Sequence, residues 1–320
     1  MFLVGQITIF VLLATSQLGH PTGEIVGTVR NGSDPSADVA DIEVVLRATI
    51  DGQFAVVEST RTDAQGEYRF ADLPITDDVI YLPGANLGDV HFPGPRVRLT
   101  VANRVGQGNI TLYRNSAGPS PLVIENHHVI VRRLVNSIEV REILEINNPS
   151  ALCYVGEPPH PGGPPVTLRL DVPPEFQRIT FDEEAWGKQF RVVNDHLVTS
   201  LPWPPGSRQL AFTYWVDAEK VTNLWQQTMI LPCRVYVLEF VGELAENSRC
   251  DLPVREVKAA DHVIYRSDQS LSTQQIVSLE FAQVTSASSL ARRAALGVLF
   301  GLVVVVCVTA SRHHLAGRAR

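Results

Sequence analysis

The sequence predicts an all-β protein made of two tandem β-sandwiches, followed by one transmembrane helix near the C-terminus. Short runs rich in Val, Ile and aromatic residues recur along two stretches, 23–116 and 123–285, with turn residues between them. No long helical periodicity interrupts these runs. An uncharged apolar run close to the C-terminus predicts the helix.

Length and composition indicate the number of domains, and net charge indicates which kinds of partner are excluded. The chain has 320 residues, of which 45% are hydrophobic and 19% are charged, so it is long enough for about two domains. Its formal net charge is −7. Because phosphate binding needs a basic surface, this charge argues against a nucleic acid as the partner.

The first stretch carries seven candidate strands at the spacing of a small sandwich. The dipeptide "DG" at 51–52 predicts a tight hairpin between two of them. A polar, turn-rich segment follows, and its residues 117–122 are expected to form a linker. The expected strands are 24–29, 41–50, 53–62, 67–73, 78–85, 96–102 and 109–114.

The second stretch predicts a larger sandwich that begins with two long paired strands. These are the runs "VIENHHVIVRRL" (123–134) and "SIEVREILEI" (137–146). Their alternation of apolar and polar residues is typical of strands with one buried face. Further strands are expected at 166–172, 177–181, 189–201, 208–216, 230–241, 262–266 and 275–284.

Residues 1–19 are apolar and contain no acidic residue, as in a signal peptide, and Ala14 and Ser16 supply small residues before a cleavage site. The alternative is an uncleaved N-terminal anchor, because Lys and Arg are missing from the first residues.

The predicted transmembrane helix covers 290–311 and contains the uncharged run "AALGVLFGLVVVVCVTA". This run of 294–310 spans about 26 Å as a helix, and the flanking arginines can extend it to the headgroups. A buried core helix is the alternative, but too little chain follows to bury it. Residues 312–320 would form a short basic cytoplasmic tail. We therefore expect a single-pass protein of the cell membrane, with most of the chain extracytoplasmic.

Three of the four cysteines lie outside the predicted membrane helix, which contains Cys307. A disulfide between Cys233 and Cys250 would close a short loop, as exported proteins allow. Cys153 would then be free or pair with another chain. The alternative is that all three thiols are reduced and buried.

The stretch "TDAQGEYRFADLP" (62–74) specifies a turn and a strand. Asp63 can accept bonds from the backbone that follows it, and Gly66 can adopt positive φ without steric cost. Tyr68 and Phe70 are two residues apart, so both point to one face and into the core. Pro74 ends the strand. Fold specification accounts for these residues.

Together with "GEIVGTV" and "ADIEVVL", this motif resembles the carboxypeptidase regulatory-like domain, a prealbumin-like (transthyretin-like) sandwich. The resemblance implies an accessory surface module, in some members linked to glycan binding. Two segments of the later region, "NNPS" (147–150) and "PWPPGSRQLAFTY" (202–214), resemble the companion region of bacterial membrane-anchored proteins that begin with such a domain.

A peptidase catalytic set is missing from the sequence. A zinc carboxypeptidase needs an H-x-x-E pair and a later histidine, and neither H-x-x-E nor H-E-x-x-H occurs. G-x-S-x-G, G-x-G-x-x-G and the Walker A motif are also missing. His127 and His128 leave opposite faces of their strand and cannot readily chelate one ion. We predict no catalytic residue, no metal and no cofactor.

Glu142 is the one polar residue on the apolar face of its strand. A buried carboxylate is costly unless it is paired. Glu142 is therefore either part of an interior polar site, turned outward by a bulge near Ile143, or paired with Arg132 or Arg133.

Two loops rich in Pro and Gly are candidate binding elements. One carries Tyr154 and His160, and the other places Trp203 between prolines. Aromatic residues on such loops often contact sugars or proteins. The alternative for Trp203 is that it caps the end of the sandwich core.

These features predict a non-catalytic, membrane-anchored envelope protein with a binding or structural role towards a protein partner or a glycan. Its strand edges or the loops of Trp203 and Tyr154 would make the contacts. The alternatives are a carbohydrate-binding module, an enzyme with a site near Glu142, and an accessory subunit of a membrane complex.

Overall fold

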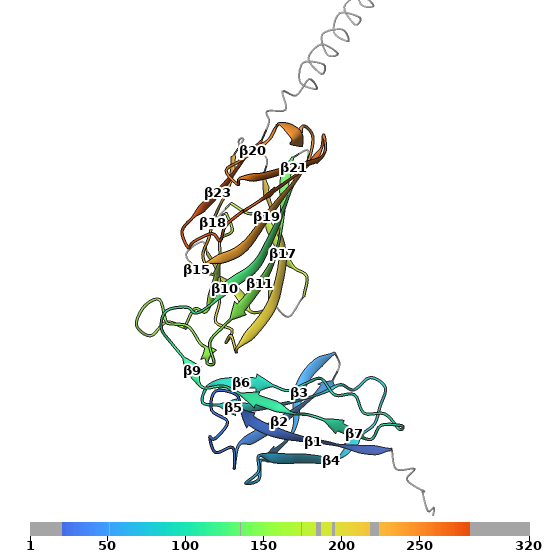
Figure 1. Ribbon diagram of the computed structural model, residues 1–320. Coiled ribbons are helices and arrows are strands. Elements are labelled where there is room, and N and C mark those ends of the chain that lie inside the picture. Colours follow the sequence, from blue (N-terminus) through green and yellow to red (C-terminus); the bar gives the residue numbers. More distant parts are fainter. Residues whose placement is uncertain are drawn as a thin grey trace, which may run out of the picture. The chain divides into compact units, whose positions relative to one another are not determined.

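The computed structural model describes residues 21–50, 52–134, 136–173, 175–183, 187–193, 196–217 and 224–281 (Figure 1). Strands and loops make up almost all of these residues, together with a short 3₁₀ helix, η1 (Ala245–Asn247). The all-β prediction is therefore confirmed. Within this part of the chain, no helix has the length and apolar character needed to cross a membrane. The predicted signal peptide, membrane helix and tail lie outside the described residues.

The chain divides into two compact units. Among the described residues, unit 1 contains those from Pro21 to Pro121 together with Asn148–Leu168 and Ser200–Gly206, and the others form unit 2. Unit 1 thus takes in two segments beyond the predicted range of 23–116. The chain passes between the units at five places rather than through a single linker.

Unit 1 is a sandwich of two sheets. One has the strand order β4-β1-β7, with β8 also paired to β1, and the other has the order β3-β2-β5-β6. Side chains from both sheets form one core that includes Ile25, Leu46 and Phe70. Its strands are β1 (Thr22–Asn31), β2 (Glu43–Ile50), β3 (Gln53–Arg61), β4 (Glu67–Pro74), β5 (Tyr81–Leu87), β6 (Val90–Pro93), β7 (Val105–Gln107), β8 (Ile110–Leu112), β9 (Asn115–Ser116) and β12 (Cys153–Tyr154).

The turn before β4 forms as its sequence predicts. Gly66 has φ +79°, and the Asp63 carboxylate accepts bonds from the amides of Gln65 at 2.9 Å and Glu67 at 2.8 Å. Tyr68 and Phe70 are buried, with ring centroids 5.7 Å apart in an edge-on arrangement. The motif therefore does what its residue types indicate: it reverses the chain and delivers two aromatic rings to the core.

Unit 2 is built around a seven-stranded sheet with the order β14-β17-β11-β10-β19-β22-β21. The two long strands predicted at its start pair antiparallel, and burial alternates at every residue of β11. Two three-stranded sheets, β13-β16-β15 and β18-β23-β20, complete the unit. Its strands are β10 (Val123–Arg133), β11 (Ser137–Asn148), β13 (Leu168–Leu170), β14 (Arg178–Phe181), β15 (Phe190–Val193), β16 (His196–Thr199), β17 (Gly206–Asp217), β18 (Leu224–Thr228), β19 (Cys233–Val241), β20 (Arg249–Cys250), β21 (Val254–Ala259), β22 (His262–Arg266) and β23 (Ile276–Glu280).

Some elements differ from the prediction. The run 96–102 forms no strand, and only Val97 makes an isolated bridge, to Tyr81. The run 189–201 is divided into β15 and β16. Strands β18 and β21 were not expected. All six residues of β21 are exposed, and its sequence "VREVKA" lacks the alternation of apolar and polar residues that marks a half-buried strand.

Candidate functional site

The two aromatic residues proposed for the binding loops are buried in unit 1. Trp203 is 0% exposed and Tyr154 is 5% exposed, and each donates its amide to the other's carbonyl at 2.9 Å. The exposed, rigid Trp203 of the binding-loop prediction is therefore wrong, and the alternative of a core position is confirmed. His160 is exposed, as its Pro- and Gly-rich loop predicts.

These loop residues belong to unit 1 because they form a small two-stranded sheet with it and contribute to its core. β12 pairs parallel with β9, and Cys153 lies in the core formed by the two sheets. The Asn148 amide donates to the carbonyls of Leu152 at 2.8 Å and Trp203 at 2.7 Å. The motifs "NNPS" and "PWPPGS" thus meet through one buried hydrogen bond, from Asn148 to Trp203.

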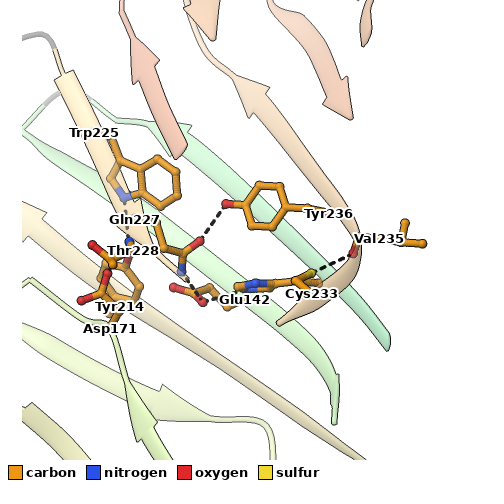
Figure 2. A network of polar contacts seen from close by, with 10 residues as sticks. Glu142, Asp171, Tyr214, Trp225, Gln227, Thr228, Cys233, Val235 and Tyr236 are labelled. Atoms are coloured by element: carbon orange, nitrogen blue, oxygen red, sulfur yellow. Dashed lines mark hydrogen bonds and ion pairs between the residues drawn. The ribbon is translucent and has the colours of Figure 1, made fainter. Parts of the chain in front are cut away.

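The interior of unit 2 contains a polar cluster centred on Glu142 (Figure 2). Four neighbouring strands of the seven-stranded sheet, β17, β11, β10 and β19, contribute in order Tyr214, Glu142, His127 and Tyr236. Gln227 reaches the cluster from β18 of another sheet. Glu142 therefore stays on the inner face that its place in the sequence predicts.

Glu142 is held by hydrogen bonds within this cluster. His127 Nε2 lies 2.9 Å from Glu142 Oε2, and Gln227 donates its side-chain amide to the same oxygen at 2.8 Å. The Tyr236 hydroxyl donates to Gln227 Oε1 at 2.7 Å, and its ring packs edge-on against His127. These bonds satisfy one oxygen of Glu142, whereas Glu142 Oε1 and His127 Nδ1 are buried and accept or donate no hydrogen bond within the described part of the chain.

The two alternatives to an interior polar site, a bulge near Ile143 and a pair with Arg132 or Arg133, are both wrong. The β10–β11 register shifts only between Ile124 and Asn126, so no bulge occurs at Ile143. Arg132 pairs with Glu139 at 3.1 Å, and Arg133 lies over the ring of Phe281. The partner of Glu142 is a histidine on the neighbouring strand instead.

The cluster is closed to solutes. Burial, reinforced by the Glu142 carboxylate, raises the pKa of the Tyr214 and Tyr236 phenols well above the usual range. The cavity beside Glu142 and His127 has a volume of about 10 Å³, roughly the space of one water molecule. A substrate has no room there, so this geometry lends no support to an enzymatic site around Glu142.

The predicted disulfide is not formed. Cys233 and Cys250 are free thiols, and they stand in strands of different sheets, β19 and β20. Burial raises the pKa of each thiol to about 12. Cys233 donates to the carbonyl of Val235 at 3.3 Å. The alternative of reduced thiols therefore holds for Cys233 and Cys250. Their spacing in the sequence does not reveal that they lie in different sheets.

Among the described residues, no group of three or more His, Cys, Asp or Glu side chains is arranged to hold a metal ion. His127 and His128 point to opposite faces of β10, as predicted. His127 is buried, whereas the side chain of His128 is 39% exposed and lies 3.2 Å from Glu239.

Unit 1 has two surface features that are open to a partner. The first is a groove of about 580 Å³ over β1 and β4. Its lining is mostly polar, with guanidinium, carboxylate, amide and hydroxyl groups from Arg61, Arg69, Asp63, Glu67, Gln107, Asn109 and Thr28.

The second feature is the free edge of the four-stranded sheet. Among the described strands, β3 pairs only with β2. Phe54, Val56 and Val57 are 40%, 60% and 45% exposed. Apolar side chains at an unpaired edge are unusual, because such an edge can recruit another strand.

No protein-family model matches the sequence, and neither does any curated protein. Among solved structures, the chain shows a weak similarity to native yeast LTA4 hydrolase, with 8% sequence identity and a TM-score of 0.32. The similarity covers 50% of this chain and 29% of that chain.

Proposed function

We propose that this chain is a non-catalytic, membrane-anchored protein of the cell envelope. Its extracytoplasmic sandwiches have a binding or structural role towards a protein partner or a glycan. The observation that carries the binding role is the exposed apolar edge β3. The anchor and the export signal rest on the apolar runs at the two ends of the sequence.

The surface of β3 supports a binding role by its chemistry. Soluble proteins normally protect a sheet edge with lysine, proline or an early bulge. Residues 53–57, "QFAVV", contain no charge and no proline, and all five are exposed. Contiguous apolar surface of this kind marks an interaction site.

The fold of unit 1 fits the same proposal. We assign it to the prealbumin-like sandwiches of carboxypeptidase regulatory-like domains, on the turn at Gly66 and the core rings of Tyr68 and Phe70. Such modules act as accessory surface domains. The buried Trp203 and Tyr154 move the expected contact surface from the loops to the sheet edge.

A photo-crosslinking experiment tests the binding role. The full-length chain carries benzoyl-phenylalanine at Phe54 and is irradiated in the membranes of the expressing cells. We expect a covalent adduct in the membrane fraction, whereas the same probe at Val101, an exposed valine of unit 1 outside β3, gives none. Failure to form any adduct at Phe54 would contradict the binding role, and recovery of the chain in the soluble fraction would contradict the anchor.

Carbohydrate binding is the second candidate, and the polar groove favours it. Sugars are recognised by planar amide, carboxylate and guanidinium groups such as those of Gln107, Glu67 and Arg69. A glycan array probed with the full chain, compared with Arg69→Ala, tests this role. Loss of a glycan signal in the variant supports the groove, and a blank array with the parent chain counts against it.

A further inference from the structure

We propose that β3 pairs antiparallel with β3 of a second copy of this chain, and so joins two four-stranded sheets edge to edge. The inference deepens the proposed function and rests on it, because it names the occupant of the exposed edge. It is argued from the direction of the main-chain groups, from the register that they allow, and from the placement of charge.

The main-chain groups of Phe54 and Val56 point towards the open edge. The Thr49 amide donates to the carbonyl of Ile80 at 3.0 Å, on the side of β2 away from β3. Thr49 faces Phe54 across the β2–β3 pair, so this pair is the non-hydrogen-bonded kind. Phe54 therefore directs its N–H and C=O outward, and Val56, two residues further along, does the same.

One register pairs all of these outward N–H and C=O groups and brings no charged side chains opposite each other. If Ala55 faces Ala55 of the second copy, Phe54 of each chain lies opposite Val56 of the other. Both pairs are then hydrogen-bonded pairs, which gives four main-chain bonds. Each also joins an aromatic to a β-branched side chain, a favourable cross-strand combination. This two-fold arrangement covers exposed apolar surface on both copies.

The placement of charge favours a second copy as the occupant. Glu58 and Arg61, the charged residues of β3, lie outside the five uncharged residues 53–57, so like charges do not face each other. Val57 is the bulge residue, because Leu46 faces Glu58 and Arg47 faces Val56. The bulge at Val57 ends the regularly paired part of β3, and the uncharged run ends at the same residue.

The edge strand β21 of unit 2 provides a contrast within the same chain. It carries Arg255, Glu256 and Lys258 among its six residues, and its register shifts between Val257 and Ala259. Charge and a bulge in mid-strand are the usual protections of an edge. Strand β21 is therefore protected against pairing, whereas the first half of β3 is open to it.

Engineered cysteines test the register in the full-length chain in membranes, in a background with Cys250→Ser and Cys307→Ser. We expect mild oxidation to link Ala55→Cys into a dimer, because facing residues of a non-hydrogen-bonded pair suit a disulfide. Gln53→Cys and Val57→Cys should not link, because each would lie four residues, about 14 Å, from its copy. The background chain should stay unlinked.

A second measurement uses detergent-solubilised full-length chain and sedimentation. The parent protein should sediment as a dimer, Val56→Lys as a monomer, and the matched control Val257→Lys on β21 as a dimer. A parent protein that stays monomeric, or equal linkage at positions 53, 55 and 57, overturns the proposal. If Ala55→Cys fails to link while the probe at Phe54 captures a different molecule, self-pairing is wrong and the binding role stands.

Discussion

His127 Nε2 lies 2.9 Å from Glu142 Oε2 in the interior of unit 2, and each side chain is 3% exposed. A carboxylate without water is stable only where neighbouring groups satisfy it. Here the neighbours are His127 from β10 of the same sheet and Gln227 from β18, so Glu142 links two sheets of the unit. A buried polar contact of this kind favours one register over others, because any slip would leave the carboxylate without partners.

Replacing Glu142 with alanine should destabilise the fold strongly. The change leaves the Gln227 amide and the His127 ring nitrogen buried without an acceptor, and each such group costs about 1–3 kcal/mol. The measurement is urea unfolding of the solubilised chain, followed by tryptophan fluorescence. Glu142→Gln keeps an acceptor at the same place and should cost about 1 kcal/mol.

Glu139→Ala is the matched control for this change. Glu139 lies on the same strand and pairs with Arg132 at 3.1 Å on the solvent side. Exposed ion pairs contribute about 0–1 kcal/mol, so this loss should be small. An equal effect of the two alanine variants would show that the buried cluster does not stabilise the fold.

The sequence located Glu142 but not its partners. Alternation along β11 was enough to place the carboxylate on the inner face, since the side-chain period of a strand is fixed by its backbone. Whether His127 lies beside Glu142 is decided by the β10–β11 register. Gln227 lies on β18, whose five residues "LWQQT" are too few and too polar to be recognised as a strand. Such pairings arise from tertiary packing, which local pattern does not encode.

The turn motif before β4 shows the opposite case, in which local residue types decide the structure. Gly66 and Gly52 both have positive φ, at +79° and +77°. A Cβ at Gly66 would lie 2.7 Å from the Val29 carbonyl oxygen, whereas a Cβ at Gly52 would meet nothing within 4 Å. A side chain at either position would strain the backbone, but only a side chain at Gly66 would also clash with a neighbouring atom.

Gly66→Ala should lower the free energy of unfolding more than Gly52→Ala. Both variants carry the backbone penalty of about 1 kcal/mol, and the first adds a clash with main chain that cannot move freely. Thermal unfolding followed by circular dichroism compares them. Equal losses would mean that the close approach at Gly66 relaxes without cost.

Trp203→Ala should act on stability rather than on binding. The Trp203 side chain is 0% exposed, and loss of a buried tryptophan costs about 3–5 kcal/mol. His160→Ala, on the exposed part of the neighbouring loop, should change stability by less than about 0.5 kcal/mol. Urea unfolding measures both variants. A fully stable Trp203→Ala chain would contradict the core position.

Trp203 and the cysteines also show where sequence pattern fails. A Trp between prolines reads as an exposed loop residue, because such segments usually lie on the surface. Here Trp203 is buried and pairs with Tyr154, and its carbonyl accepts a bond from Asn148, 55 positions earlier in the sequence. The spacing of Cys233 and Cys250 likewise carries no information on whether their strands share a sheet.

The stability of unit 2 should fall as the pH rises above 9. The Cys233 thiol ionises near 9.0 in an unfolded chain, and burial raises its pKa to about 12 in the folded protein. Between these values the unfolded chain loses the proton first, so ionisation favours unfolding. Urea unfolding at pH 8 and at pH 10 should therefore show a loss that is smaller in Cys233→Ala. The thiol should also resist alkylation at pH 8 until urea unfolds the chain. A thiol that stays unreactive after non-reducing unfolding would instead indicate a disulfide and contradict the free state of Cys233.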